Sequence, residues 1–304
     1  MPSPSRRAFL TGHRPPTDSW TAMCQRLDRL VTGSVHKLDA VNGYGQARLL
    51  AHALTDVHHA RAVCAAEGVQ LAFGGGPAPL VDVSRPVLWV TPGSGLARCE
   101  RLEPQGSRWF VQPGCTVAAL QAAGFNGLQG VASDTTVADW LLSADGARSQ
   151  VPGVLGVSGL VYASVLLADG TSAGLGPFGE RNTKPLQGWS LQQLVSSLFQ
   201  LIWSPEAQVC RAQTRWLARY RLDSLLPEPP EGINLSRLLL GSHGALGWPE
   251  WVVLDDAMAS QPVRESASLS MDPDPAVCLA ARQLDRQIKQ LFDPDGLFFE
   301  PDLF

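Results

Sequence analysis

The sequence predicts an α+β fold, and three observations carry that prediction. A short apolar segment at 69–73 runs into a glycine-rich stretch and is followed by a second apolar segment at 87–90, which is typical of strands separated by a loop. Residues 157–168 form the longest strand-like run and end at an Asp-Gly turn that leads into another strand. From Pro275 onward, apolar residues instead repeat at helical spacing. Strands and helices therefore share the core, and an all-helical protein is excluded.

Composition narrows the function classes. The chain has 304 residues, 45% of them hydrophobic, which is enough for one large domain or two subdomains. Lys plus Arg number 24 against 28 acidic residues, and no window concentrates positive charge, so we expect no electrostatic binding to nucleic acid. No apolar run approaches the ~20 residues of a membrane span. The six cysteines show no C-x-x-C pair and no zinc spacing, so we expect reduced thiols and no metal site.

The N-terminal stretch SRRAFLTG, residues 5–12, is similar to a twin-arginine export signal. Such a signal continues into an apolar stretch, whereas this chain continues with HRPPTDSW. We therefore expect a cytoplasmic protein, with export as the alternative.

Local signals predict several helices. A helix from Thr55 ends at Gly68, and a shorter one from Thr116 ends at Gly124, since both glycines suit a left-handed C-cap. Ser190 with Gln193 predicts a capping box at the start of a third helix. Ser204 and Pro205 open a fourth, expected to run to about Arg221.

The segment SRLLLGSHGALGW, residues 236–248, places glycines at 241, 244 and 247. Glycine is required where φ is positive or where another group comes closer than a Cβ allows. One interpretation is a ligand lying against the backbone, and the other is a tight bend at a sheet edge. His243 is a weak candidate for a catalytic residue there, against the alternative of a neutral histidine satisfied by a backbone partner.

Three further motifs have a functional and a structural interpretation each. The glycine run at 74–76 can hold a phosphate on its backbone N–H groups, or form a simple turn, because Pro77 and Pro79 remove donors. The VQPG strand-turn contains Pro113 and Gly114. The SDTTV segment at 133–137 can line a ligand or cap a helix.

The order of these motifs resembles a known family. A strand with a Gly-rich loop, then VQPG, SDTTV, LVYASVLLADG, LLLGSHGALG and FDPDGLFFEP follow one another as in the FAD-binding domain of the vanillyl-alcohol oxidase family, of para-cresol methylhydroxylase type. The chain is most similar to the FAD-binding subunits of glycolate oxidase. The resemblance covers roughly residues 45–185, 236–254 and 276–301, and the order is more specific than any single motif.

The resemblance implies two mixed α/β subdomains that sandwich a non-covalently bound FAD. A helix-rich stretch of about 50 residues at 186–235 intervenes before the last glycine loop, so a helical insertion is expected there. Only about 20 residues separate the strand at 251–254 from the last helix, so a full substrate cap is not expected. The residues that match the cofactor-binding motifs are Gly74, Gly75, Gly76, Pro113, Gly114, Ser133, Asp134, Thr136, Val137, Gly241, Ser242, Gly244 and Gly247.

The implied organisation is an N-terminal extension (1–44), a first FAD-binding subdomain (45–100), a second (101–185), the helical insertion (186–235), a flavin-contacting loop and strand (236–256), and a linker with the C-terminal helix (257–304). The implied function is an oxidoreductase subunit that passes electrons from a small organic substrate, such as a 2-hydroxy acid, to an acceptor. Aromatic residues in the insertion and the missing cap suggest a partner, such as a second dehydrogenase or an iron–sulfur subunit.

Departures from the family pattern favour an alternative. The first loop runs into Pro77 and Pro79, and the family's TVGG is replaced by a sequence ending in Asp139, whose charge would repel a diphosphate. The alternative is a structural or accessory subunit that has lost its cofactor. The three glycines at 241–247 favour FAD, because an idle loop has less need of them.

Overall fold

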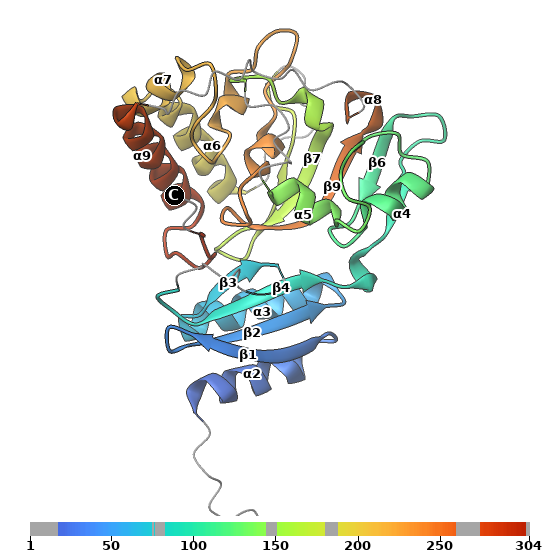
Figure 1. Ribbon diagram of the computed structural model, residues 1–304, viewed down its shortest axis with the longest axis vertical. Helices are drawn as coiled ribbons and strands as arrows, with labels where there is room; N and C mark the ends of the chain where they lie inside the picture. The colour runs from blue at the N-terminus through green and yellow to red at the C-terminus, as the bar shows by residue number, and fades with distance from the viewer. Residues whose placement is uncertain are drawn as a thin grey trace, which may run out of the picture.

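The computed structural model describes residues 18–74, 76, 83–143, 151–179, 188–259 and 274–301. Two sheets lie one above the other along the long axis of the molecule, each with its own helices (Figure 1). The mixture of strands and helices in two layered units confirms the predicted α+β class.

The first sheet has four strands in the order β1-β2-β4-β3. β1 (Ser34–Val41) and β2 (Tyr44–Ala51) form an antiparallel hairpin that the sequence analysis missed. β4 (Val87–Pro92) pairs in parallel with both β2 and β3 (Gln70–Phe73). The central strand β4 is buried along most of its length, which matches the continuous apolar run of its sequence.

Two helices cover this sheet. α2 (Ser19–Leu30) packs on α3 (Leu54–Glu67), which connects β2 to β3. Gly68 ends α3 with φ 66°, as predicted. The predicted start was one residue late, because the carboxylate of Asp56, inside the first turn, receives the backbone N–H groups of His52 and Ala53.

The second sheet has five strands, all paired antiparallel, in the order β5-β6-β9-β7-β8. Its strands are β5 (Cys99–Arg101), β6 (Arg108–Val111), β9 (Trp248–Asp255), β7 (Leu160–Leu166) and β8 (Ser172–Leu175). The Asp-Gly turn between β7 and β8 is where the sequence predicts it. The strand β9 is therefore central, although it lies far from its neighbours in sequence.

Helices surround the second sheet and complete its core (Figure 1). They are α4 (Val117–Ala122), α5 (Val137–Leu142), α6 (Trp189–Leu201), α7 (Pro205–Arg211), α8 (Asp256–Ala259) and α9 (Pro275–Phe292), with 3-10 turns η1 (Ser94–Leu96), η3 (Gly156–Ser158), η4 (Leu222–Leu225) and η5 (Leu235–Leu239). Helix α9 packs against α6 and α7, and its buried residues recur at the helical spacing predicted from Pro275 onward.

Two helix predictions were wrong. Ser190 is not the cap of α6, which begins at Trp189 after Gly188. Helix α7 ends at Arg211 instead of running to Arg221. Further along the chain, the carboxylate of Asp285 on α9 accepts the backbone N–H groups of Arg219 and Tyr220, which a helix continuing to Arg221 would use internally.

The segment after α9 returns to the first sheet. Leu71 of β3 receives and donates backbone hydrogen bonds with Phe299 and Leu297. The ring of Phe299 lies 5.4 Å from that of Trp89 on β4. The two sheets are thus joined by the end of the described chain as well as by the connection between β4 and β5.

Within the described ranges, no helix is long and apolar enough to cross a membrane, and no cluster of side chains is suited to a metal ion. All six cysteines are free thiols.

Candidate functional site

The VQPG and SDTTV segments lie side by side. The carbonyl of Pro113 accepts the N–H of Ala138 at 3.1 Å, and the carbonyl of Cys115 accepts the N–H of Val137 at 2.8 Å. The absence of a side chain at Gly114 is required by protein packing, since a Cβ there would lie 2.9 Å from the carbonyl oxygen of Gly93. The structure therefore brings together two motifs that are 20 residues apart in the sequence.

The glycine loop at 241–247 is hydrogen-bonded to the end of α5. Leu141 accepts the N–H of Gly241 at 3.0 Å, and Leu142 accepts the N–H of His243 at 2.8 Å. His243 has a φ of 53°, which is uncommon for a residue with a side chain. Since α5 begins at the SDTTV segment, three of the four predicted motifs form one connected unit.

The strand that leads into the fourth motif meets this unit at Gly244. A Cβ on Gly244 would lie 2.8 Å from the Cβ of Phe73, the last residue of β3. A Cβ on Gly247 would lie 2.6 Å from Cγ2 of Val165 on β7. Gly244 and Gly247 also have φ of 77° and 151°, so both the left-handed backbone and the close protein contacts require glycine. Protein atoms, rather than open space, lie in the directions where their side chains would point.

Open space is found instead at the first loop. Gly74 and Gly76 have φ of 118° and 152°. A Cβ on Gly74 would meet nothing within 4 Å, and one on Gly76 would touch only a methyl group of Leu38. Both follow β3, a parallel strand, and the carboxyl ends of parallel strands are where open sheets bind ligands. Gly75, Pro77 and Pro79 lie outside the described residues.

The SDTTV segment acts as a helix cap. Thr136 accepts the N–H of Asp139 at 3.0 Å and donates its hydroxyl to the Asp139 carboxylate at 2.6 Å. Ser133, Asp134 and Asp139 are exposed. The capping interpretation is confirmed, and the carboxylate of Asp139 faces solvent at the start of α5, where an anionic ligand would encounter its charge.

Two side chains of the glycine loop differ in character. Ser242 is completely buried, and its hydroxyl has no hydrogen-bond partner within the described chain. Burial, and then the charge of Arg219, lowers the pKa of His243, so the imidazole is neutral near pH 7. A neutral imidazole with low basicity is a poor general base at that pH.

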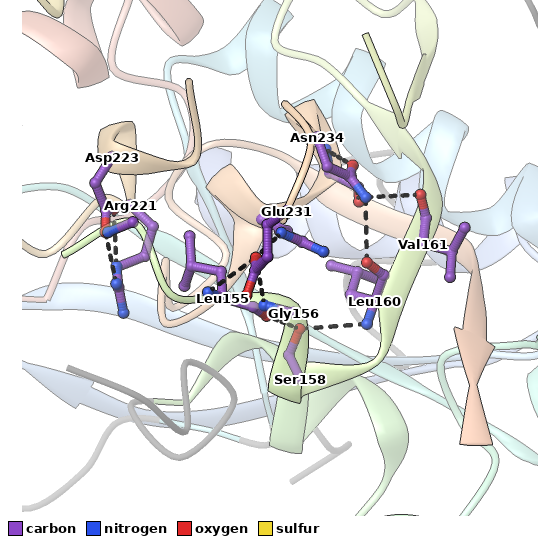
Figure 2. Close-up of polar contacts among 12 residues, drawn as sticks. Leu155, Gly156, Ser158, Leu160, Val161, Arg221, Asp223, Glu231 and Asn234 are labelled. Atoms are coloured by element: carbon purple, nitrogen blue, oxygen red, sulfur yellow. Dashed lines mark hydrogen bonds and ion pairs between the residues drawn. The ribbon is translucent and has the colours of Figure 1, made fainter. Parts of the chain in front are cut away.

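A pocket that the sequence analysis missed lies at the opposite end of the second sheet. It has a volume of about 740 Å³ and is bordered by the segment 228–237, by η3, and by the ends of β6 and β9. Glu231 accepts the N–H groups of Leu155 and Gly156 at 3.3 and 2.8 Å (Figure 2). It also pairs with Arg237. Asn234 donates its amide N–H groups to the carbonyls of Leu160 and Val161 (Figure 2).

The only sequence signal for this pocket is an acid and an arginine six residues apart in EGINLSR. The prolines just before it, at 227, 229 and 230, indicate only a rigid connection. The partners of Glu231 lie about 75 residues earlier in the chain, so the pocket depends on tertiary contacts.

No protein-family model and no curated protein sequence matches the chain. Solved structures do show similarity. The wild-type BBE-like 1 protein of Physcomitrella patens has 11% identity and a TM-score of 0.43 over 77% of this chain and 44% of its own. A variant of that protein has 15% identity and a TM-score of 0.39 over 51% and 37%. An alkyldihydroxyacetonephosphate synthase has 11% identity and a TM-score of 0.41 over 70% and 32%.

The chain thus spans less than half the length of each of these proteins. At TM-scores below 0.5 no family membership follows from them.

Proposed function

We propose that the chain is an FAD-binding oxidoreductase that holds the dinucleotide non-covalently where the four motifs meet. The observation that carries this proposal is the joining of the β3 end, the VQPG turn, the start of α5 and the 241–247 loop into one unit. Gly74 and Gly76 fit a phosphate there, because their left-handed backbone faces open space.

We also propose a substrate class and a partner subunit. The substrate is a small organic molecule such as a 2-hydroxy acid, from which a bound FAD would take two electrons and pass them to an acceptor. In the 186–235 insertion, Trp216 and Tyr220 are buried in the core, whereas Trp189 and Trp203 are 77% and 62% exposed. We propose that these two exposed indoles form the surface that contacts a second dehydrogenase or iron–sulfur subunit.

Two specific observations favour a second candidate, a cofactor-less accessory subunit. The close contacts at Gly244 and Gly247 are already made by Phe73 and Val165, so the loop needs no flavin ring to explain its glycines. The Asp139 carboxylate is exposed beside the proposed diphosphate position. Both features are those of a scaffold that keeps its fold without the ligand.

The test is FAD binding to the purified chain. If FAD binds, acid should release flavin absorbance from the protein, or added FAD at 100 times its Kd should stabilise it by ~2.7 kcal/mol. Neither flavin release nor stabilisation would overturn the FAD proposal and favour the accessory subunit.

A matched pair of variants locates the diphosphate. Asp139→Asn removes the charge next to the proposed site and should tighten FAD binding several-fold in titration calorimetry, because charge repulsion weakens binding of an anion. Glu103→Gln, at an exposed position outside the four motifs, is the control and should change the affinity less. Equal effects would argue against a diphosphate at the start of α5.

A further inference from the structure

We propose that the pocket beside Arg237 is a second ligand site, which binds a small, mainly apolar molecule carrying one carboxylate. Its volume of about 740 Å³ falls within the range of small-molecule sites. This site does not depend on the FAD proposal.

The pocket is distant from the glycine loops. Strand β9 begins with Trp248, which packs in the core of the first sheet, and ends with Asp255, which borders the pocket. Seven residue steps at about 3.3 Å place these two ends roughly 23 Å apart. A ligand in the pocket therefore occupies a separate position from a dinucleotide at the motif junction.

Most of the wall is apolar and suits a hydrocarbon body. The apolar residues that line it include Val154, Val161, Ile233, Met258 and two prolines at 229 and 230. Apolar walls with few polar groups are typical of sites that bury most of a small ligand.

The polar feature is a buried arginine with unused donors. Arg237 is 5% exposed, and within the described chain its guanidinium donates only to Glu231. A guanidinium carries five N–H donors, and within the described chain the Nε and Nη2 groups of Arg237 donate to no acceptor. Leaving donors unpaired away from water costs free energy, so an acceptor that pairs with them is favoured. A carboxylate matches the planar guanidinium in shape and charge.

The Glu231 side chain pairs with Arg237 through a single oxygen, Oε2. It already receives the N–H groups of Leu155 and Gly156 at the turn η3, which fixes its position. The arrangement is therefore preorganised: the carboxylate holds one edge of Arg237, and the remaining donors are left for another group. Preorganisation lowers the cost of binding because no side chain has to be ordered first.

Other charges around the pocket limit the ligand to a single negative charge. Glu228 and Asp255 lie on the wall with Glu231, against Arg108 and Arg237. Three carboxylates would repel a second anionic group. A phosphate ester or dicarboxylate is thus disfavoured relative to a monocarboxylate.

The experiment compares a carboxylate probe with its neutral twin. We expect 4-phenylbutyrate to bind the full chain at least tenfold more tightly than 4-phenylbutanamide in calorimetry or ligand-observed NMR. Met258→Trp fills the pocket and should abolish binding of both. Arg286→Gln, at an exposed position on α9 outside the pocket, should change the affinity less than threefold.

Arg237→Lys tests the guanidinium directly, since it keeps the charge but loses the planar donors. It should weaken the binding of 4-phenylbutyrate at least tenfold and leave the binding of 4-phenylbutanamide unchanged. Circular dichroism checks that the variant is folded. If that variant does not fold, the acid–amide comparison and Met258→Trp still decide. Absence of saturable binding, equal binding of acid and amide, or undiminished binding to Met258→Trp would overturn the proposal.

Discussion

At the scale of single residues, buried acidic side chains in this protein hold the backbone in place by hydrogen bonds. Asp56 is 1% exposed and accepts four backbone N–H groups, from Thr32, Gly33, His52 and Ala53. Burial raises its pKa, but these hydrogen bonds outweigh burial and leave the pKa below its usual value. One carboxylate thereby fixes the start of α3 and the approach to β1.

We predict that Asp56→Ala destabilises the protein by more than ~3 kcal/mol, because several charge-assisted hydrogen bonds are lost together. The measurement is urea unfolding at pH 7. Since the folded pKa is lowered, the stability from Asp56 is present above pH 4 and is lost as the pH falls, so the variant and the wild type should converge in acid. A constant difference down to pH 3 would contradict this.

The pKa of Asp285 is shifted in the opposite direction to that of Asp56. Burial raises its pKa to about 6 from 3.8, against the lowering effect of hydrogen bonds from Arg219 and Tyr220. Between pH 4 and pH 6 the folded state holds a proton that the unfolded state releases, so this contribution to stability falls as the pH rises through that window.

Relative to Asp285→Asn, which has no such titration, the wild type should therefore lose up to ~3 kcal/mol between pH 4 and pH 7. Chemical denaturation of both proteins across this range is the measurement. A pH-independent difference between them would show that the Asp285 carboxyl titrates normally.

At the scale of elements, the loop at 241–247 sets how the two sheets meet. Its backbone is hydrogen-bonded to the end of α5, and Gly244 touches Phe73 at the end of β3. The contact depends on a residue that has both a positive φ and no Cβ.

We predict that Gly244→Ala destabilises the protein by ~2–4 kcal/mol, through left-handed strain plus the clash with the Phe73 Cβ. Gly130→Ala is the matched control, because Gly130 has a similar φ of 84° but open space where its Cβ would lie. The control should be destabilised by the backbone strain alone, ~1–2 kcal/mol. Equal losses in thermal or urea unfolding would show that the contact with Phe73 relaxes freely.

At the scale of the whole molecule, the sheets are also joined by polar contacts. Glu250 on β9 accepts hydrogen bonds from Ser164 and Ser172 of its own sheet at 2.6 and 2.8 Å. Its other contact is with His58 on α3 of the first sheet, at 2.8 Å. Arg61, one turn further along α3, donates to the carbonyl of Ala168 in the second unit.

Glu250→Ala should destabilise the folded chain by ~2–4 kcal/mol, because it leaves three polar partners without their common acceptor. Glu67→Ala removes an exposed ion pair with Arg26 and should cost less than ~1 kcal/mol. Urea unfolding followed by tryptophan fluorescence measures both. Similar small effects would mean that the joint is held by apolar packing alone.

The sequence by itself determined the α+β class, the strands β3, β4, β6 to β9 in outline, and the two helices that end at a glycine or begin at a threonine cap. These depend on local signals, such as Gly68, Thr116 and the Asp-Gly turn, whose effects act within a few residues. It also identified the four motifs that the structure brings together.

Only the tertiary structure decided which residues lie beside these motifs. The hairpin β1–β2 alternates too weakly to be recognised. The backbone at Arg219 and Tyr220 is not helical as predicted, and its N–H groups bind Asp285, more than 60 residues away. The glycines at 244 and 247 face Phe73 and Val165, and Arg237 borders a pocket, because of contacts between distant segments. Such contacts depend on packing in three dimensions, which no local pattern encodes.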